Sequence, residues 1–140
     1  MDKRKRGGVK TMAIDPKHMT LASIDFSYCT ILEKDYGSFA FENANFSHAR
    51  IEGVDFSGCE FACCNMEDTQ FTNCEMTKTQ FQECRLFGAE FLDCKLDGAS
   101  FSWCGLQQSG FIRSRLDQVS MEKCETKEMI CIGHQEQSMA

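Results

Sequence analysis

Cysteine offers the widest chemistry in this 140-residue chain, which contains ten of them. Thiolates bind metals, act as nucleophiles and form disulfides. A cysteine metal site usually shows paired C-x-x-C spacing, and no such pair occurs. Eight of the cysteines instead lie multiples of five residues apart: Cys29, Cys59, Cys64, Cys74, Cys84, Cys94, Cys104 and Cys124. This pattern favours small, buried, inert thiols, so we predict neither a metal site nor a cofactor.

A second candidate chemistry is hydrolysis by a serine, a histidine and an aspartate. Ser47 adjoins His48, while Tyr28 and Asp68 lie twenty residues on either side of that histidine. Nucleophilic catalysis also needs an oriented base and an oxyanion hole inside a concavity. The regular repeat described below contains no inserted loop that could form one. We therefore predict no catalytic residue and no enzymatic activity, and we expect these side chains to form a solvated ladder.

Charge is distributed unevenly along the chain. Residues 1–17 carry six basic and two acidic side chains, whereas residues 21–125 carry eight basic and seventeen acidic ones. The tract Lys3–Arg6 could bind nucleic acid or act as a nuclear-import signal, although such runs are more often flexible termini. We expect direct nucleic-acid binding only through this tail, and initiation at Met12 would remove it.

The composition also bears on the compartment. The longest apolar run is only a few residues, which is too short for a transmembrane helix. No apolar stretch follows the basic N-terminus as it would in a secretory signal peptide. Together with the many thiols, these features favour a cytoplasmic protein that does not bind a membrane.

The chain is organised by an internal repeat of five residues. From Leu21 to Met121 every fifth residue is large and apolar, which gives twenty-one in succession. Such residues make up 40 of the 140, so chance would place about six of them at these positions. Two residues before each centre, at positions 24 to 119, seventeen of twenty residues are Ala, Cys, Ser, Thr or Val. Large and small residues therefore alternate, and the rest of each quintet is mostly polar.

A period of five fits neither the helical repeat of about 3.6 nor the strand repeat of about two. It is satisfied when the large and small residues share the inner face of a short extended segment, and the chain then turns a corner. Four such sides close a coil of twenty residues. Successive coils then stack by backbone hydrogen bonds at about 4.8 Å.

The quintets resemble the motif A(D/N)(L/F)XX of the pentapeptide-repeat proteins. Residues 44–48 read ANFSH, residues 54–58 read VDFSG and residues 64–68 read CNMED. The resemblance covers residues 21–125 and implies an all-β fold, the right-handed quadrilateral β-helix solenoid, with about five coils here. The expected core repeat centres include nine phenylalanines: Phe41, Phe46, Phe56, Phe61, Phe71, Phe81, Phe91, Phe101 and Phe111.

The repeat predicts three parts. Residues 1–20 are expected to be a basic flexible tail and an N-terminal cap, in which Asp15 and Pro16 could begin a short helix. Residues 21–125 form the β-helix. Residues 126–140 form a C-terminal cap or tail, because Thr126 breaks the pattern. Lys34 and Phe39 occupy slots for small residues, which predicts a distorted or open first coil.

Acidic residues should stack on two neighbouring faces. Asp35, Asp55 and Glu75 fall in one column, with Glu33 and Glu52 beside it. Acidic surfaces commonly keep such rods soluble. The first hypothesis for the function is a structural and protein-interaction module that docks an unidentified partner. The second is mimicry of the DNA phosphate backbone.

The second hypothesis draws on the resemblance. Quintets such as residues 56–59, which read FSGC, are similar to those of the Qnr branch. Qnr-type and MfpA-type proteins bind DNA gyrase and topoisomerase IV, which implies a type II topoisomerase as the partner and a change in quinolone sensitivity. The unbroken register departs from that branch, in which several members carry projecting loops.

Outward apolar residues suggest a contact between copies. Phe87, Leu92 and Ile112 fall near the C-terminal coils, and an exposed cluster there would favour a homodimer. Scattered exposed hydrophobic residues are the common alternative. Among the thiols, Cys63 is predicted to point outward and to be the most reactive.

Overall fold

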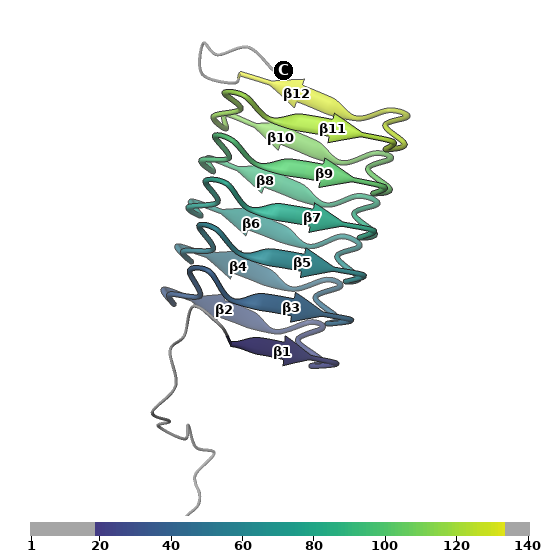
Figure 1. Ribbon diagram of the computed structural model, residues 1–140. Helices are drawn as coiled ribbons and strands as arrows, with labels where there is room; N and C mark the ends of the chain where they lie inside the picture. The colour runs from purple at the N-terminus through teal and green to yellow at the C-terminus, as the bar shows by residue number, and fades with distance from the viewer. Residues whose placement is uncertain (1–18, 134–140) are drawn as a thin grey trace, which may run out of the picture.

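The chain forms a solenoid of short strands and turns. The computed structural model describes residues 19–133, which contain twelve three-residue strands and no helix. The first sheet holds the odd-numbered strands β1 Thr20–Ala22, β3 Ala40–Glu42, β5 Glu60–Ala62, β7 Gln80–Gln82, β9 Ser100–Ser102 and β11 Ser120–Glu122. The second sheet holds the even-numbered strands β2 Thr30–Leu32, β4 Arg50–Glu52, β6 Gln70–Thr72, β8 Glu90–Leu92, β10 Gly110–Ile112 and β12 Ile130–Ile132. The two sheets stack as opposite sides of one rod (Figure 1).

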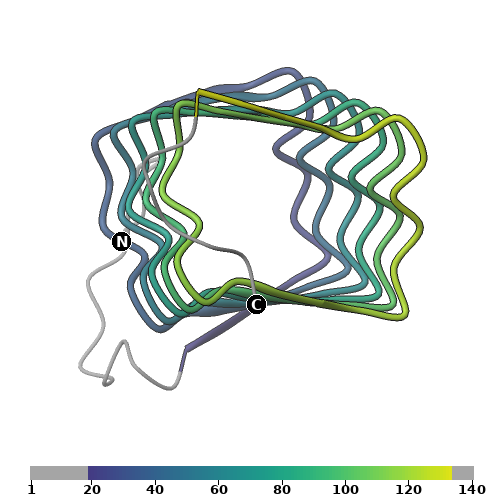
Figure 2. The ribbon, with the colours of Figure 1, turned by 90° about the horizontal axis from the view of Figure 1, so that it is seen from above.

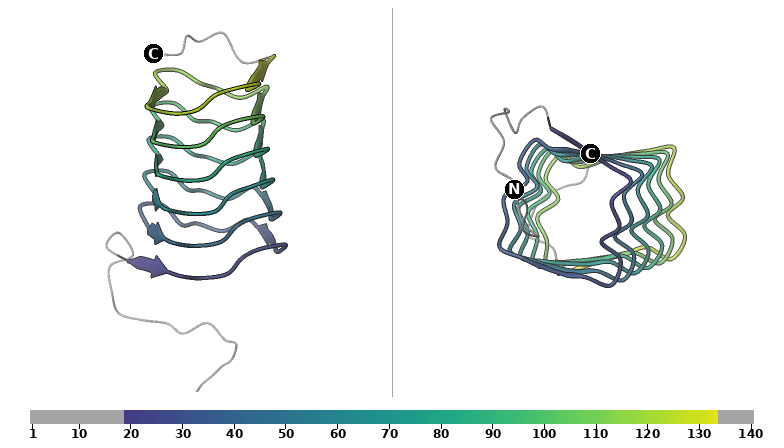
Figure 3. Two further views of the ribbon diagram at one scale, coloured as in Figure 1. Left: turned by 90° about the vertical axis from the view of Figure 1, so that its right-hand side faces the viewer. Right: turned by 90° about the horizontal axis from the view of Figure 1, so that it is seen from below.

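All strand pairs are parallel and join residues twenty positions apart. Phe61 of β5 pairs with Phe81 of β7, and Phe71 of β6 pairs with Phe91 of β8. Because the spacing never changes, each coil repeats the one before it, as the side view in Figure 3 shows. The predicted quadrilateral β-helix is confirmed.

Single bridges hold the two remaining sides. We call the side at positions 25, 45, 65, 85, 105 and 125 the first bridge face, and the side at positions 35, 55, 75, 95 and 115 the second bridge face. Seen along the axis, the two sheets and the two bridge faces give a four-sided outline (Figure 2).

Left-handed backbone conformations turn the corners. Eighteen non-glycine residues have φ between 45° and 65°, and with five glycines they fill every fifth position from 23 to 133. For a residue other than glycine this conformation costs roughly 1–2 kcal/mol. The cost recurs at eighteen of the 23 corners, so burial between the corners must offset it.

Aromatic rings stack along the axis inside the rod. Phe81 lies 5.1 Å from Phe61 and 4.5 Å from Phe101 between ring centroids. Phe91 lies 4.7 Å from Phe111 in the column behind the second sheet. All nine predicted phenylalanines are fully buried: Phe41, Phe46, Phe56, Phe61, Phe71, Phe81, Phe91, Phe101 and Phe111. Each such side chain contributes about 1.5–3 kcal/mol by burial.

The small inward residues connect neighbouring coils by hydrogen bonds. Thr69 Oγ1 donates to the carbonyl oxygen of Phe46 at 2.7 Å, and that oxygen also accepts the N–H of Ala49. Seven cysteines make the equivalent bond to the carbonyl 23 residues earlier: Cys59, Cys64, Cys74, Cys84, Cys94, Cys104 and Cys124. A carbonyl oxygen has two lone pairs, so Cys, Ser and Thr use an acceptor site that alanine leaves free.

The solenoid is longer than predicted. Each sheet has six strands, which gives about six turns rather than five. Strand β12 pairs with β10 beyond the expected end at residue 125, and the N–H of Ile130 donates to the carbonyl of Ser109. The ladder continues because backbone groups form it, and Thr126 does not interrupt them.

The first coil is also more regular than predicted. The N–H of Asp55 donates to the carbonyl of Lys34, and the N–H of Glu60 donates to that of Phe39, so both unusual residues keep their ladder bonds. Lys34 is exposed, and the ring of Phe39 packs edge-on against Tyr36 at 5.6 Å. The oversized residues are accommodated at the open end of the core.

Two predicted segments lie outside the described residues. They are the basic tail with its capping helix before residue 19 and the end of the chain after residue 133. In the part that is described, no helix has the length and apolar character needed to cross a membrane.

Candidate functional site

The predicted acidic column forms on the second bridge face and changes sign partway along it. Asp35 bridges to Asp55, and Asp55 bridges to Glu75. The next positions hold Lys95 and Arg115. Glu75 Oε2 lies 3.3 Å from Lys95 Nζ, so the last carboxylate of the run is paired with a cation. The continuous negative charge is therefore limited to three residues.

Glu33 and Glu52 meet at the neighbouring corner. The N–H of Glu33 donates to the carbonyl of Glu52 at 3.0 Å. With Leu32 and Gly53, both residues line a shallow depression of about 310 Å³. All five predicted acidic residues thus lie on adjoining sides of the N-terminal half of the rod.

Opposite charges pair between successive coils along the rod. Four such pairs join an acidic residue to a basic residue 18 or 20 positions later: Glu67–Arg85, Glu75–Lys95, Asp93–Arg113 and Asp97–Arg115. The Asp93–Arg113 contact is bidentate, with distances of 2.9 and 3.0 Å, and it lowers the pKa of the Asp93 carboxyl. The period of twenty that stacks the core also aligns these charges.

The three predicted apolar contact residues lie on two neighbouring sides of the rod. Leu92 and Ile112 pair across β8 and β10 on the second sheet. Phe87 instead lies on the first bridge face, with Gly88 as the corner between the two sides. A corner therefore separates Phe87 from the two residues on the second sheet, as its place in the preceding quintet predicts.

The apolar column on the second sheet continues past the predicted residues. Ile112 pairs with Ile132 of β12, whose side chain is 54% exposed. Ile130 on the same strand is 49% exposed, and its neighbour on β10 is Gly110. We call Leu92, Ile112, Ile130 and Ile132 the C-terminal apolar stripe. From the sequence, the two isoleucines of β12 were assigned to the C-terminal cap or tail after residue 125, where they could cover the last coil or meet a second chain, so their place in the ladder was not predicted.

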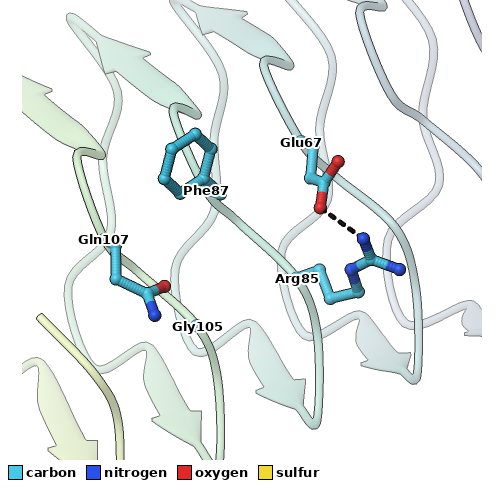
Figure 4. Close-up of a pocket in the computed structure, with 5 residues that line it drawn as sticks. All are labelled: Glu67, Arg85, Phe87, Gly105 and Gln107. Atoms are coloured by element: carbon cyan, nitrogen blue, oxygen red, sulfur yellow. Dashed lines mark hydrogen bonds and ion pairs between the residues drawn. The ribbon is translucent and has the colours of Figure 1, made fainter.

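Phe87 borders a shallow depression of its own. Together with Glu67, Arg85, Gly105 and Gln107 it lines a hollow of about 300 Å³ (Figure 4). Arg85 Nη2 donates to Glu67 Oε2 at 2.6 Å, so the charge at this rim is already paired. The hollow exists because Gly105 has no side chain where its neighbours do.

The candidate hydrolytic residues form a surface ladder. The rings of Tyr28 and His48 stack at 4.7 Å with an interplanar angle of 8°. His48 Nε2 lies 3.8 Å from Asp68 Oδ2. Within residues 19–133 no hydrogen bond joins Ser47 to His48; the Ser47 N–H donates to Asn45 Oδ1 instead. This arrangement does not activate the serine.

The cysteines divide into buried and exposed groups. Six of them are buried: Cys59, Cys64, Cys74, Cys84, Cys94 and Cys104. Burial raises the pKa of the Cys59 thiol to about 12, which makes that thiol inert at neutral pH. Across residues 19–133, no three His, Cys, Asp or Glu side chains are placed to share a metal ion.

Cys63 is exposed, as predicted, but its surroundings oppose reactivity. Its thiol donates to Glu83 Oε1 at 3.4 Å. That hydrogen bond raises the pKa of the Cys63 thiol, because it stabilises the protonated form beside a carboxylate. The repeat therefore predicted that Cys63 is exposed. It did not predict that the carboxylate of Glu83, in the next coil, lies beside the thiol and raises its pKa.

Taken together, these features define a β-solenoid with a closed core and shallow surface depressions. The sequence profile of the pentapeptide repeat region matches residues 54–130. The chain belongs to the pentapeptide-repeat family. Comparison with curated proteins gives no match.

Several solved structures resemble the chain at low identity. A pentapeptide repeat protein, Rfr23 from the cyanobacterium Cyanothece 51142, is 12% identical with a TM-score of 0.43, covering 82% of this chain and 87% of that one. Trypsin-treated QnrB1, a plasmid-mediated fluoroquinolone resistance protein, is 15% identical with a TM-score of 0.46, covering 84% and 73%. A thylakoid-lumen protein of Arabidopsis thaliana is 16% identical with a TM-score of 0.41, covering 77% and 74%.

The Cys63–Glu83 contact predicts a change in thiol reactivity. In the variant Glu83→Gln the pKa of Cys63 should fall, so more thiolate is present at pH 7 to 8 and alkylation by iodoacetamide should be faster. The thiolate fraction should rise by about tenfold for each pKa unit recovered, and the rate by a smaller factor, because a less basic thiolate is a weaker nucleophile. Peptide mapping by mass spectrometry measures Cys63 separately, and the exposed Cys29 serves as an internal control whose rate stays constant. An unchanged Cys63 rate would show that Glu83 does not control this thiol.

Proposed function

We propose that this protein is a non-enzymatic interaction module that docks another protein through the C-terminal apolar stripe. The observation that supports the proposal is the row Leu92, Ile112 and Ile132, which runs across three adjacent strands. Leu92 and Ile112 are partly exposed, and Ile132 at the end of the row is exposed. Contiguous exposed apolar surface of this kind commonly marks an interaction site. Parallel sheets are usually covered on both faces, and within residues 19–133 no element covers the outer face of this one.

A second copy of the chain is the partner that the charges favour. Of the six outward positions on β8, β10 and β12, only Glu90 is charged. The outward positions of the first sheet carry three acidic and no basic residues, namely Glu42, Glu60 and Glu122. Two copies that met through the first sheet would repel each other, whereas an uncharged stripe can face its own equivalent.

DNA mimicry is a second candidate, and the run Asp35–Asp55–Glu75 favours it. At about 4.8 Å per coil these carboxylates extend over roughly 10 Å. Double-stranded DNA carries one charge per about 1.7 Å of its axis. Because Lys95 and Arg115 continue the column with the opposite sign, the mimicry would be confined to the N-terminal half.

The stripe predicts the oligomeric state. The unaltered chain should be a dimer by light scattering at micromolar concentration. The dissociation constant of the dimer should be at least about tenfold higher for the double variant Ile112→Ser with Ile132→Ser, because each isoleucine buried in the interface contributes about 1.5–3 kcal/mol. Leu32→Ser is the matched control, because Leu32 is 52% exposed in the same column on β2, outside the stripe. A monomeric parent chain, or a double variant that stays dimeric, would reject the proposal.

The acidic run predicts an effect on DNA gyrase if the second candidate holds. Micromolar protein should then alter supercoiling, with or without a quinolone, and Asp55→Lys with Glu75→Lys should abolish most of that effect. Glu60→Lys on the first sheet is the control, because it changes a charge outside the run. No effect of the parent protein, or equal loss in the control, would exclude mimicry by this face.

A further inference from the structure

Four cysteines form a continuous line inside the first bridge face. They are Cys64, Cys84, Cys104 and Cys124, one in each of four successive coils. The residues that follow them bridge in parallel: Asn65 with Arg85, Arg85 with Gly105, and Gly105 with Glu125. Each cysteine therefore lies directly above the one before it.

The sulfur atoms occupy equivalent places in every coil. The four thiols donate to the carbonyl oxygens of Phe41, Phe61, Phe81 and Phe101, at distances of 3.5, 3.3, 3.4 and 3.3 Å. Because the geometry repeats, neighbouring sulfur atoms are separated by one coil, which is about 4.8 Å.

This separation suits a metal ion held by two ligands in line. A metal–thiolate bond is about 2.3 Å long, so two bonds on opposite sides of one ion reach about 4.6 Å. Zinc needs four ligands in a tetrahedron, which a straight column does not supply. A soft cation that prefers thiolates and accepts two ligands in line meets the geometry.

The charge of the ion decides which of these soft cations fits the site. An ion of charge +2 with two thiolates is neutral, whereas an ion of charge +1 would leave a net negative charge in the apolar interior. The large residues of the same coils, such as Leu106, Phe101 and Met66, are apolar and fully buried. Mercury(II) is the soft divalent cation that has this coordination preference.

We propose that Cys104 and Cys124 form a two-coordinate site for a soft divalent cation such as mercury(II). Two S–H bonds break, two metal–sulfur bonds form and two protons leave to solvent, with no change of oxidation state. Cys124 is only partly buried, at the C-terminal end of the first bridge face, so it gives the ion a way in. Cys104 then supplies the second thiolate from inside the core.

The C-x-x-C criterion could not have found this site. That spacing brings ligands together in a single turn of chain, whereas here the ligands are twenty residues apart and adjacent only because the coils stack.

The experiment starts from a parent variant in which the three exposed cysteines, Cys29, Cys63 and Cys131, are replaced by serine. One equivalent of mercury(II) acetate is added, and native mass spectrometry follows the product. The expected adduct gains one mercury atom, loses two protons and carries no acetate. Its midpoint of thermal unfolding should rise by several degrees, because the ion links the last coil to the one beneath it.

Two further substitutions locate the ion. Cys124→Ala should take up mercury at least about tenfold more slowly, because its remaining stacked thiols are buried and inert. Alanine fills the same inward slot at Ala44, Ala89 and Ala99, so the fold tolerates it, and circular dichroism checks this. Cys59→Ala removes a buried thiol that has no cysteine stacked on it and should behave like the parent. Equal uptake by Cys124→Ala, an adduct that retains acetate, or a lowered unfolding midpoint would overturn the proposal.

Discussion

The stacking of large side chains twenty residues apart is the interaction on which this structure depends. Every corner from position 23 to 133 adopts a left-handed conformation, and at the eighteen corners without glycine this conformation opposes folding. Burial of a phenylalanine, leucine, isoleucine or methionine between corners offsets that cost. The backbone ladder adds uniform parallel pairing, but it does not choose the register. The inward side chains determine the register between coils, because a slip of one residue would expose them to solvent.

Because the core is filled with side chains, the function of this protein must depend on the outer surface of the rod. The interior is filled with rings and small donors, and the depressions among the described residues are shallow. All coils have the same backbone, so one face differs from another only in its outward side chains. Paired charges neutralise the middle of the rod, carboxylates dominate its N-terminal half, and uncharged isoleucines mark the last strands of the second sheet. Selective binding has to be encoded in these columns.

The sequence predicted the inward columns well because burial repeats with a fixed period. It placed Phe61 on Phe81 and Asp35 beside Asp55, and both are neighbours in the structure. The prediction was wrong at the C-terminal end of the repeat. Thr126 does not fit the side-chain pattern, but backbone hydrogen bonds still continue the ladder to β12. The carbonyl bonds of the cysteines needed atomic positions, so only the structure could supply them.

The most direct test of the period of twenty is to lengthen the chain by one coil. In a chain where residues 80–99 are duplicated in tandem, every later residue returns to its own column. This chain should keep a single cooperative unfolding transition and a strand signal in circular dichroism that grows with its length. Duplication of residues 80–97 adds nearly the same sequence but moves every later residue out of register, and it should lose the C-terminal coils. Equal stability of the two chains would contradict the account.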